Sequence, residues 1–389
     1  DLFFLSSDGI HDVISLVELT AIINNQQFSL EQRCQQLHEL AADKCSNDNL
    51  SCQLIHVDTL PAFNKDEFCR QLTQLPFPPL LSPGQSLDNL VIEKELHASN
   101  RSQVYLIRDT DNRHFIMKTP SDNYRDDAAY IERFILESWI GDRVNSSNVV
   151  KVHQPTQPPT ALYYLTEYIN GITLGQWMKE NPRPAVNDVI SLVSQIAKGI
   201  RALHRKDIIH QDIKPDNIII DSNGVPKILD FGSCLARGIS EIAVPVEREL
   251  ALGTLDYSAP EHALKRPINS QSDLYSLALI TYEMLAGKPA FKGGLTRSSN
   301  VNDFLALEYK PSHDYNPLIP HWVDGAIKKA LNYRPELRYT ELDEFIYDLQ
   351  NPNKEFANPI QKPLIERATV KFWKLACVAL LLSHLLWLL

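Results

Sequence analysis

The chain has 389 residues, of which 44% are hydrophobic and 22% charged, and its formal net charge is −10. This length allows two or three domains. The acidic balance, without a basic stripe, argues against nucleic acid as a partner. The six cysteines show neither zinc-ligand spacing nor a compact disulfide framework, which favours a reducing, cytosolic environment. They are Cys34, Cys45, Cys52, Cys69, Cys234 and Cys377.

Two acidic patterns occur near the beginning of the chain. An apolar run at residues 2–5 leads into Ser7-Asp8-Gly9, and residues 48–51 read DNLS before a second apolar run. Paired carboxylates at two strand ends suit hard cations that prefer oxygen ligands. Together the patterns resemble the late part of metal-dependent type 2C protein phosphatases. The resemblance implies that Asp8 and Asp48 bind Mn²⁺ or Mg²⁺.

The phosphatase resemblance covers only residues 1–60. The N-terminal half of that family, with its other metal carboxylates, is missing, and a sheet cut in this way cannot complete a binuclear site. We therefore expect a partial α/β sandwich fragment of a longer fusion protein, without phosphatase activity of its own.

A linker is predicted next, at residues 61–88. Residues 75–84 contain four prolines, which disfavour helix and pre-set extended backbone. Short apolar runs then predict strands, and a helix carrying Glu137 is expected among them. The predicted strands are residues 90–95, 104–108, 115–118 and 162–168.

The most specific motif follows a helix predicted at residues 189–206. Residues 210–217 read HQDIKPDN, and an apolar strand then runs into Asp230-Phe231-Gly232. Two such motifs at this separation resemble the catalytic loop and metal-binding segment of eukaryotic-type protein Ser/Thr kinases. Lys214, two residues after Asp212, is typical of the Ser/Thr form of the loop.

The kinase resemblance implies an α+β, two-lobed protein kinase fold over residues 89–350, with a β-rich small lobe and a large helical lobe. Asp212 would accept the proton of the incoming hydroxyl, and Lys214 would neutralise charge on the transferred phosphoryl group. Asn217 and Asp230 would hold Mg²⁺.

The resemblance also implies a nucleotide site in the small lobe. Lys118 would bind the α- and β-phosphates of ATP, with Glu137 as its helical partner. Glu132 is the competing candidate, but the spacing from Glu137 to the next strand matches the family better. Thr166 would precede the hinge. Further nucleotide contacts are expected at Leu96, Val104, Glu167 and Ile169.

Two assignments in the large lobe are structural. Glu261, at the end of the activation segment, is expected to form a buried ion pair with Arg338, whose planar fork suits a carboxylate. Asp273 is expected to hold the backbone of the catalytic loop.

The chain departs from the kinase pattern at two places. The phosphate loop, residues 96–104, has His97, Ser99 and Ser102 where the family has GxGxxG, so a weaker or less mobile phosphate clamp is expected. Gln211 stands where many kinases have Arg. Because Gln cannot form a charge-assisted bond to a phosphate, activation is expected not to depend on phosphorylation of the activation segment. A harmless polar substitution is the alternative.

At the other end, a linker at residues 351–371 leads to residues 372–389, which are almost all apolar. Eighteen helical residues span ~27 Å, so they predict a single-pass transmembrane helix. Preceding basic residues would keep the kinase on the cytoplasmic side. An apolar helix docking on the kinase or on a partner is the alternative.

We therefore predict a membrane-tethered kinase that uses ATP and Mg²⁺ to phosphorylate Ser and Thr hydroxyls of proteins. A pseudokinase scaffold, which binds partners without phosphotransfer, is the alternative. The loss of loop glycines favours that alternative, whereas the presence of Lys118, Asp212, Asn217 and Asp230 favours activity.

Overall fold

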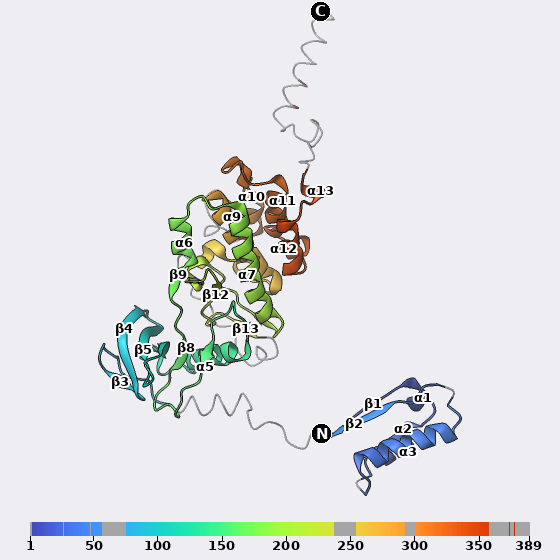
Figure 1. Cartoon of the computed structure of the whole chain (residues 1–389). Coiled ribbons are helices and arrows are strands. Elements are labelled where there is room, and N and C mark those ends of the chain that lie inside the picture. The colour runs from blue at the N-terminus through green and yellow to red at the C-terminus, as the bar shows by residue number, and fades with distance from the viewer. Residues whose placement is uncertain are drawn as a thin grey trace, which may run out of the picture. The chain divides into compact units, whose positions relative to one another are not determined.

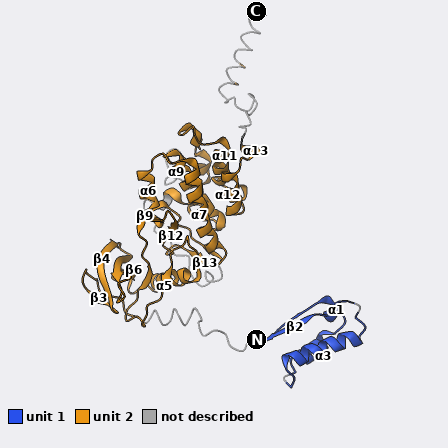
Figure 2. Ribbon diagram, in the orientation of Figure 1, with its two compact units in different colours: residues 1–70 blue, residues 71–389 orange. Residues whose placement is uncertain are grey.

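The computed structural model describes residues 2–25, 27–46, 48–56, 75–236, 254–291 and 300–357, together with Trp373 and Cys377. The chain divides into two compact units, residues 1–70 and residues 71–389, coloured separately in Figure 2.

In the described residues of the first unit, a two-stranded antiparallel sheet is accompanied by three helices. Strand β1 (Leu2–Ser6) pairs with β2 (Cys52–His56). Helices α2 and α3 each begin with a capping box, in which a Ser side chain and the third helical residue satisfy each other's backbone N–H groups. The helices are α1 (Asp8–His11), α2 (Leu16–Ile23) and α3 (Leu30–Asp43). Their buried core is Ile10, Ile14, Leu19, Leu37 and Ala41.

The second unit begins with a six-stranded antiparallel sheet in the order β3-β4-β5-β6-β8-β7. Strands β3, β4, β5 and β8 of this sheet are labelled in Figure 1. Its strands are β3 (Ser86–Leu87), β4 (Leu90–Ala98), β5 (Ser102–Arg108), β6 (His114–Pro120), β7 (Val152–His153) and β8 (Tyr164–Glu167). Alternate residues point to opposite faces of a sheet. Met117 and Leu165 therefore enter the apolar core of one face, whereas Lys118 and Tyr164 lie opposite each other on the other face.

Part of the segment predicted as a linker packs on this sheet. Leu81 is buried in the same apolar core as Met117, and strand β3 pairs with β4. The carbonyl of Pro76 accepts a hydrogen bond from the N–H of Leu162 at 2.8 Å. Leu81 and Leu87 of this segment thus pack into the apolar core of the small lobe, whereas Leu80 stays exposed.

Helix α5 (Ala128–Arg143) lies on the Lys118 face of the sheet. It begins at the N-cap Asp127, whose carboxylate accepts from the N–H of Tyr130 at 3.0 Å. The ring of Phe134 packs against that of Tyr164 on β8, 5.3 Å between centroids. This packing places Glu137, one turn further along, beside the sheet.

The large lobe is mostly helical (Figure 1). Helix α9 is buried on all faces, and it ends at Gly287, whose φ of +64° is a left-handed conformation that Gly adopts without strain. Its core is shared mainly with α7 and α11. The helices are α6 (Leu174–Glu180), α7 (Val186–His204), α8 (Pro260–Ala263), α9 (Ser270–Ala286), α10 (Val301–Ala306), α11 (His321–Ala330), α12 (Leu342–Gln350) and α13 (Lys354–Ala357).

Two small sheets in this lobe hold the segments that carry the motifs. Strands β9 (Gly171–Thr173), β11 (Ile218–Asp221) and β12 (Pro226–Ile228) form one sheet. Strands β10 (Ile208–Ile209) and β13 (Leu235–Ala236) form the other. Residues 210–217 therefore leave β10 and enter β11, while residues 229–234 connect β12 to β13.

The predicted membrane anchor requires a correction. Within the described part of the chain, every helix is too short or too polar to cross a bilayer. This finding overturns the predicted localisation through a single-pass helix at residues 372–389. Of that segment the structure describes Trp373 and Cys377, and the rest lies outside the described residues.

Candidate active site

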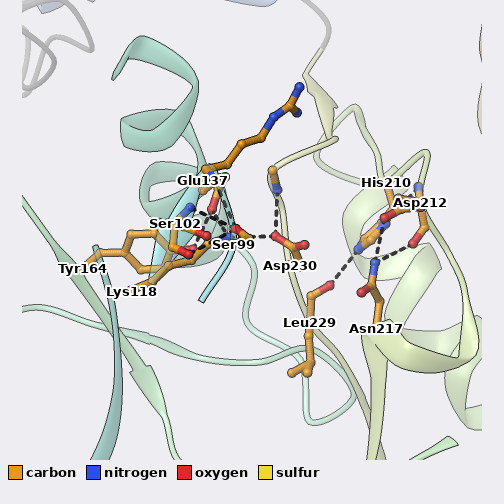
Figure 3. Close-up of polar contacts among 12 residues, drawn as sticks. Ser99, Ser102, Lys118, Glu137, Tyr164, His210, Asp212, Asn217, Leu229 and Asp230 are labelled. Carbon is orange, nitrogen blue, oxygen red and sulfur yellow. Dashed lines mark hydrogen bonds and ion pairs between the residues drawn. The ribbon is translucent and has the colours of Figure 1, made fainter. Parts of the chain in front are cut away.

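Three charged side chains from distant segments meet beside the sheet (Figure 3). The Nζ of Lys118 lies 2.7 Å from Oε2 of Glu137 and 3.0 Å from Oδ1 of Asp230. The hydroxyl of Tyr164 donates to the same Glu137 oxygen at 2.7 Å. The ion pair between Lys118 and Glu137 is therefore present as predicted, and it belongs to Glu137 rather than to Glu132.

Burial and charge act in opposite directions on this cluster. Burial alone would lower the pKa of Lys118, but the carboxylates of Asp230 and Glu137 outweigh it and raise that pKa well above its ordinary value. The positive charge of Lys118 in turn lowers the pKa of Asp230 from 3.8 to about 2. Lys118 and Asp230 are thus both charged at neutral pH.

The cluster leaves no space for a side chain at position 232, which is occupied by glycine. A Cβ atom at this position would lie 2.5 Å from Oε1 of Glu137 and 3.3 Å from Oδ1 of Asp230. The N–H of Gly232 also donates to Asp230 Oδ1 at 3.3 Å. The glycine after Phe231 is thus required by close approach rather than by a left-handed backbone.

The side chains of residues 212–217 form a second cluster. Lys214 Nζ donates to Oδ2 of Asp212 at 2.8 Å. The amide nitrogen of Asn217 donates to the same oxygen and to the backbone carbonyl of Asp212, both at 2.9 Å. Because Asn217 makes both bonds through nitrogen, its side-chain oxygen is the atom that it offers to a cation.

The two clusters are joined through the backbone. The N–H of Leu229 donates to the carbonyl of Asn217 at 2.8 Å, and the carbonyl of Leu229 accepts from Nε2 of His210 at 3.0 Å. Asp230, the next residue, therefore stands between the Lys118 cluster and the Asp212 cluster, as Figure 3 shows.

Asp273 on α9 holds the backbone of the loop at residues 210–217, as predicted. Its buried carboxylate accepts from the N–H of His210 at 2.9 Å and from the N–H of Gln211 at 2.8 Å. Gln211 has a φ of +68°, a left-handed conformation that is uncommon for a residue with a side chain. His204 adds a third contact, with Nε2 at 2.8 Å from the carboxylate. Sequence reasoning missed His204 because its contact depends on packing between α7 and α9.

The phosphate loop is closed by one of its own side chains. The Oγ of Ser99 accepts from the N–H of Arg101 at 3.2 Å and from the N–H of Ser102 at 3.1 Å. It also donates to the carbonyl of Ser102 at 3.1 Å. The side chain of Ser99 thus occupies two backbone N–H groups of the loop, a role that a short Ser-turn could have suggested.

The predicted nucleotide contacts lie along the same lobe. Leu96 is on β4, and Val104 is on β5 opposite His97. Glu167 ends β8, where its carboxylate accepts from Lys227 Nζ at 2.7 Å, and Ile169 packs against a buried apolar cluster. The side chain of Glu167 therefore ties the end of the small-lobe sheet to β12.

Residues 237–253, which include most of the predicted activation segment, lie outside the described residues. At the end of that segment, the predicted pair of Glu261 and Arg338 is confirmed. Nη1 of Arg338 lies 2.6 Å from Oε1 of Glu261, and Nη2 lies 3.0 Å from Oε2.

The side chains of Asp230 and Asn217 suit a cation whose remaining ligands come from water and from a substrate. Among the described residues, no group of three or more His, Cys, Asp or Glu side chains could hold a metal ion. Mg²⁺ is often held by one or two carboxylates together with water and the phosphates of a substrate. The carboxylate of Asp230 and the amide oxygen of Asn217 match that kind of donor set.

In the first unit, the two predicted metal carboxylates lie at the same end of the sheet. Asp8 begins α1 directly after β1, and Asp48 precedes β2. Ser7 and Asn49, their neighbours, are joined by a hydrogen bond of 2.7 Å from the Ser7 hydroxyl to the Asn49 carbonyl. The structure thus brings the two turns together.

The two lobes, the Lys118–Glu137 pair and the cluster at Asp212 define the class of the second unit as a protein kinase domain. The family described as "Protein kinase domain" matches residues 91–349. The chain belongs to this family.

Curated relatives agree on the type of kinase. The chain is 28% identical over 268 residues to a probable serine/threonine-protein kinase of Clostridium acetobutylicum, which covers 69% of this chain and 40% of the relative. It is also 28% identical to serine/threonine-protein kinase PrkC of Bacillus subtilis, with coverage of 64% and 38%. For serine/threonine-protein kinase PknB of Mycolicibacterium smegmatis the identity is 28%, with coverage of 69% and 44%.

Residues 91–349 thus form a bacterial-type serine/threonine protein kinase domain. The chain spans less than half the length of these three relatives.

Proposed function

We propose that this protein transfers the γ-phosphate of ATP to Ser and Thr hydroxyls of protein substrates, with Mg²⁺ as cofactor. The observation that carries the proposal is the simultaneous presence of the Lys118–Glu137 ion pair and of Asp212 between Lys214 and Asn217. Protein kinases need both arrangements, one to position ATP and the other to orient the hydroxyl.

Each residue has a chemical task under this proposal. Asp212 accepts the proton of the substrate hydroxyl, and Lys214, 2.8 Å from its carboxylate, neutralises charge on the transferred phosphoryl group. Lys118 binds the α- and β-phosphates and is held in place by Glu137. Asn217 and Asp230 hold Mg²⁺, which supplies charge neutralisation at the phosphates.

A substitution at Asp212 tests the proposal. Asp212→Asn keeps the size of the side chain but removes the base, so phosphotransfer should fall ~10²–10⁴-fold while ATP affinity stays within about twofold. The measurement is transfer of labelled γ-phosphate to a generic protein, with phosphoamino-acid analysis and nucleotide affinity in parallel. Undiminished transfer in the variant, or label on tyrosine alone, would contradict the assignment.

One observation favours a second candidate, a pseudokinase scaffold. The hydroxyl of Ser99 occupies the N–H groups of Arg101 and Ser102, which would otherwise be offered to phosphate. A chain that binds nucleotide or a partner but transfers no phosphate from ATP–Mg²⁺ to any generic protein would support this candidate. The intact Asp212 cluster makes the active kinase the better proposal.

We also propose that the first unit derives from a type 2C phosphatase. Asp8 and Asp48 at one end of a strand pair support this idea, and in an intact domain they would bind Mn²⁺ or Mg²⁺. Residues 1–60 alone should hydrolyse no phosphoprotein, because two carboxylates cannot complete a binuclear site. Measurable metal-dependent hydrolysis by this chain, abolished by Asp8→Ala, would contradict that expectation.

A further inference from the structure

The phosphate loop is tied to the first turn of helix α5. The carbonyl of Arg101 accepts hydrogen bonds from the hydroxyl of Tyr130 and from the N–H of Ser121, the latter at 2.9 Å. Beside it, the carbonyl of Asn100 accepts from the side-chain amide of Asn123 at 3.5 Å. The tip of the loop therefore has polar contacts with the segment that connects β6 to α5.

Burial and ring packing hold the hydroxyl of Tyr130 next to the carbonyl of Arg101. The residue is 9% exposed, and its ring stacks on that of Tyr124, 4.8 Å between centroids. Burial raises the pKa of Tyr130 to about 12, so the hydroxyl keeps its proton and can donate. The same hydroxyl oxygen accepts from the N–H of Ser121 at 3.3 Å.

The helix that holds the loop also holds the catalytic lysine. Tyr130 and Glu137 are seven residues apart on α5, which is two helical turns or ~10.5 Å along the axis, and residues at this spacing share one face. Glu137 reaches Lys118 and Tyr130 reaches Arg101. A shift of α5 would therefore disturb both contacts.

The hydrogen bonds between the phosphate loop and α5 matter because the loop lacks glycine at all three family positions. A glycine loop is flexible and takes its shape around phosphate. Here Ser99 makes hydrogen bonds within the loop, and Tyr130 on α5 donates a hydrogen bond to the carbonyl of Arg101. The loop is thus shaped before any nucleotide arrives.

We propose that Tyr130 is a positioning residue that couples the phosphate loop to α5, so that the loop and the Lys118–Glu137 pair order together. The coupling deepens the proposed kinase function, because it says how a loop without glycine can meet ATP. The contacts of Tyr130 with the phosphate loop exist in the protein without nucleotide. They can therefore be tested whether or not the protein transfers phosphate.

The first experiment therefore uses the protein without nucleotide. Amide hydrogen exchange at residues 99–102 should rise about fivefold or more in Tyr130→Phe, because a lost hydrogen bond is worth ~1 kcal/mol. The matched control is Tyr163→Phe, which removes another buried tyrosine hydroxyl, bonded to Asp88 at 3.0 Å in the same lobe. Equal exchange at residues 99–102 in both variants and the wild type would overturn the proposal.

Coupling to the catalytic lysine is tested by a double-mutant cycle. Glu137→Gln weakens the hold of α5 on Lys118, and it should raise exchange at residues 99–102 several-fold when Tyr130 is present. In the Tyr130→Phe background it should add little. Independent, multiplicative effects of the two substitutions would mean that Tyr130 does not transmit the change.

Nucleotide affinity distinguishes loss of the contact between Tyr130 and the loop from general damage to the fold. Tyr130→Phe should raise the KM for ATP about fivefold, with kcat within about twofold, and it should leave the affinity for adenosine unchanged because adenosine has no phosphates. A matching loss of adenosine affinity would show a merely structural role and overturn the proposal. Absence of ATP binding by the wild type would instead contradict the proposed function. The exchange experiment would still show whether Tyr130 orders the phosphate loop.

Discussion

Arg338 offers the sharpest stability test in the molecule. Its guanidinium is fully buried and donates to both carboxylate oxygens of Glu261. It also donates to the backbone carbonyls of Asn332 at 2.6 Å, Gln271 at 3.0 Å and Tyr333 at 3.2 Å. Arg338→Ala would leave the Glu261 carboxylate buried without its counter-charge.

The size of the effect follows from this burial. Removing one partner of a buried ion pair costs ~3–5 kcal/mol, because the remaining charge is left uncompensated. For a domain of this size, 1 kcal/mol corresponds to ~2–4 °C in Tm, so Arg338→Ala should lower Tm by roughly 6–20 °C. Arg338→Lys should recover only part of the loss, since an ammonium cannot match the carboxylate bidentately.

An exposed arginine provides the matched control. Arg113 also pairs with two carboxylate groups, Asp109 at 2.7 Å and Asp111 at 3.0 Å, but its side chain is 58% exposed. Exposed pairs contribute ~0–1 kcal/mol. Thermal unfolding of Arg338→Ala and Arg113→Ala, followed by fluorescence under the same conditions, should therefore differ by several degrees. Equal Tm values would refute the argument from burial.

Three further predictions concern the site. Replacing His97, Ser99 and Ser102 by Gly should lower the KM for ATP, because the loop N–H groups lose their serine acceptor while Tyr130 still holds the carbonyl of Arg101. An unchanged or raised KM in steady-state kinetics would mean that the side chains already serve phosphate. Because Gln211 cannot pair with a phosphate as Arg does, enzyme treated exhaustively with a phosphatase should keep its full rate from the first turnover; a lag that shortens with enzyme concentration would contradict this. The lowered pKa of Asp230 means that the stability it contributes is fully present above about pH 4 and is lost as the pH falls through about 2. Acid unfolding of Asp230→Asn should show a weaker pH dependence between these values, and an unchanged profile would count against the ion pair with Lys118.

Several parts of the site could be predicted because their chemistry is local. The motif at residues 210–217 places Asp212, Lys214 and Asn217 on one short loop, so their side chains lie within reach of one another. Apolar spacing likewise predicted the helix at residues 189–206, which the structure shows as α7 (Val186–His204), because burial of one helix face depends mainly on the order of apolar residues. The strand at residues 162–168 proved shorter, β8 covering Tyr164–Glu167.

Other parts depended on contacts between distant segments. Residues 76–88 looked like a linker because prolines suppress regular structure, yet Leu81 and β3 are part of the small lobe. The closure of the phosphate loop by Ser99, and its tie to Tyr130, depend on the direction of side chains in a turn, which composition does not specify. The predicted membrane anchor rested on the length and apolar composition of residues 372–389 and on the basic residues before them, and it required correction.

The family and the chemical groups of the candidate site could be inferred from the chain alone, since reactive residues at fixed spacing are a local property of a sequence. How those groups are held depends on contacts in the folded protein. Lys118 and Asp230 are 112 residues apart, and their contact exists because strand register and the packing of α5 bring them to one place. Long-range contacts of this kind bring together the opposite charges that shift the pKa values of Lys118 and Asp230 against the effect of burial. Such proximity is a property of the packed fold rather than of any segment.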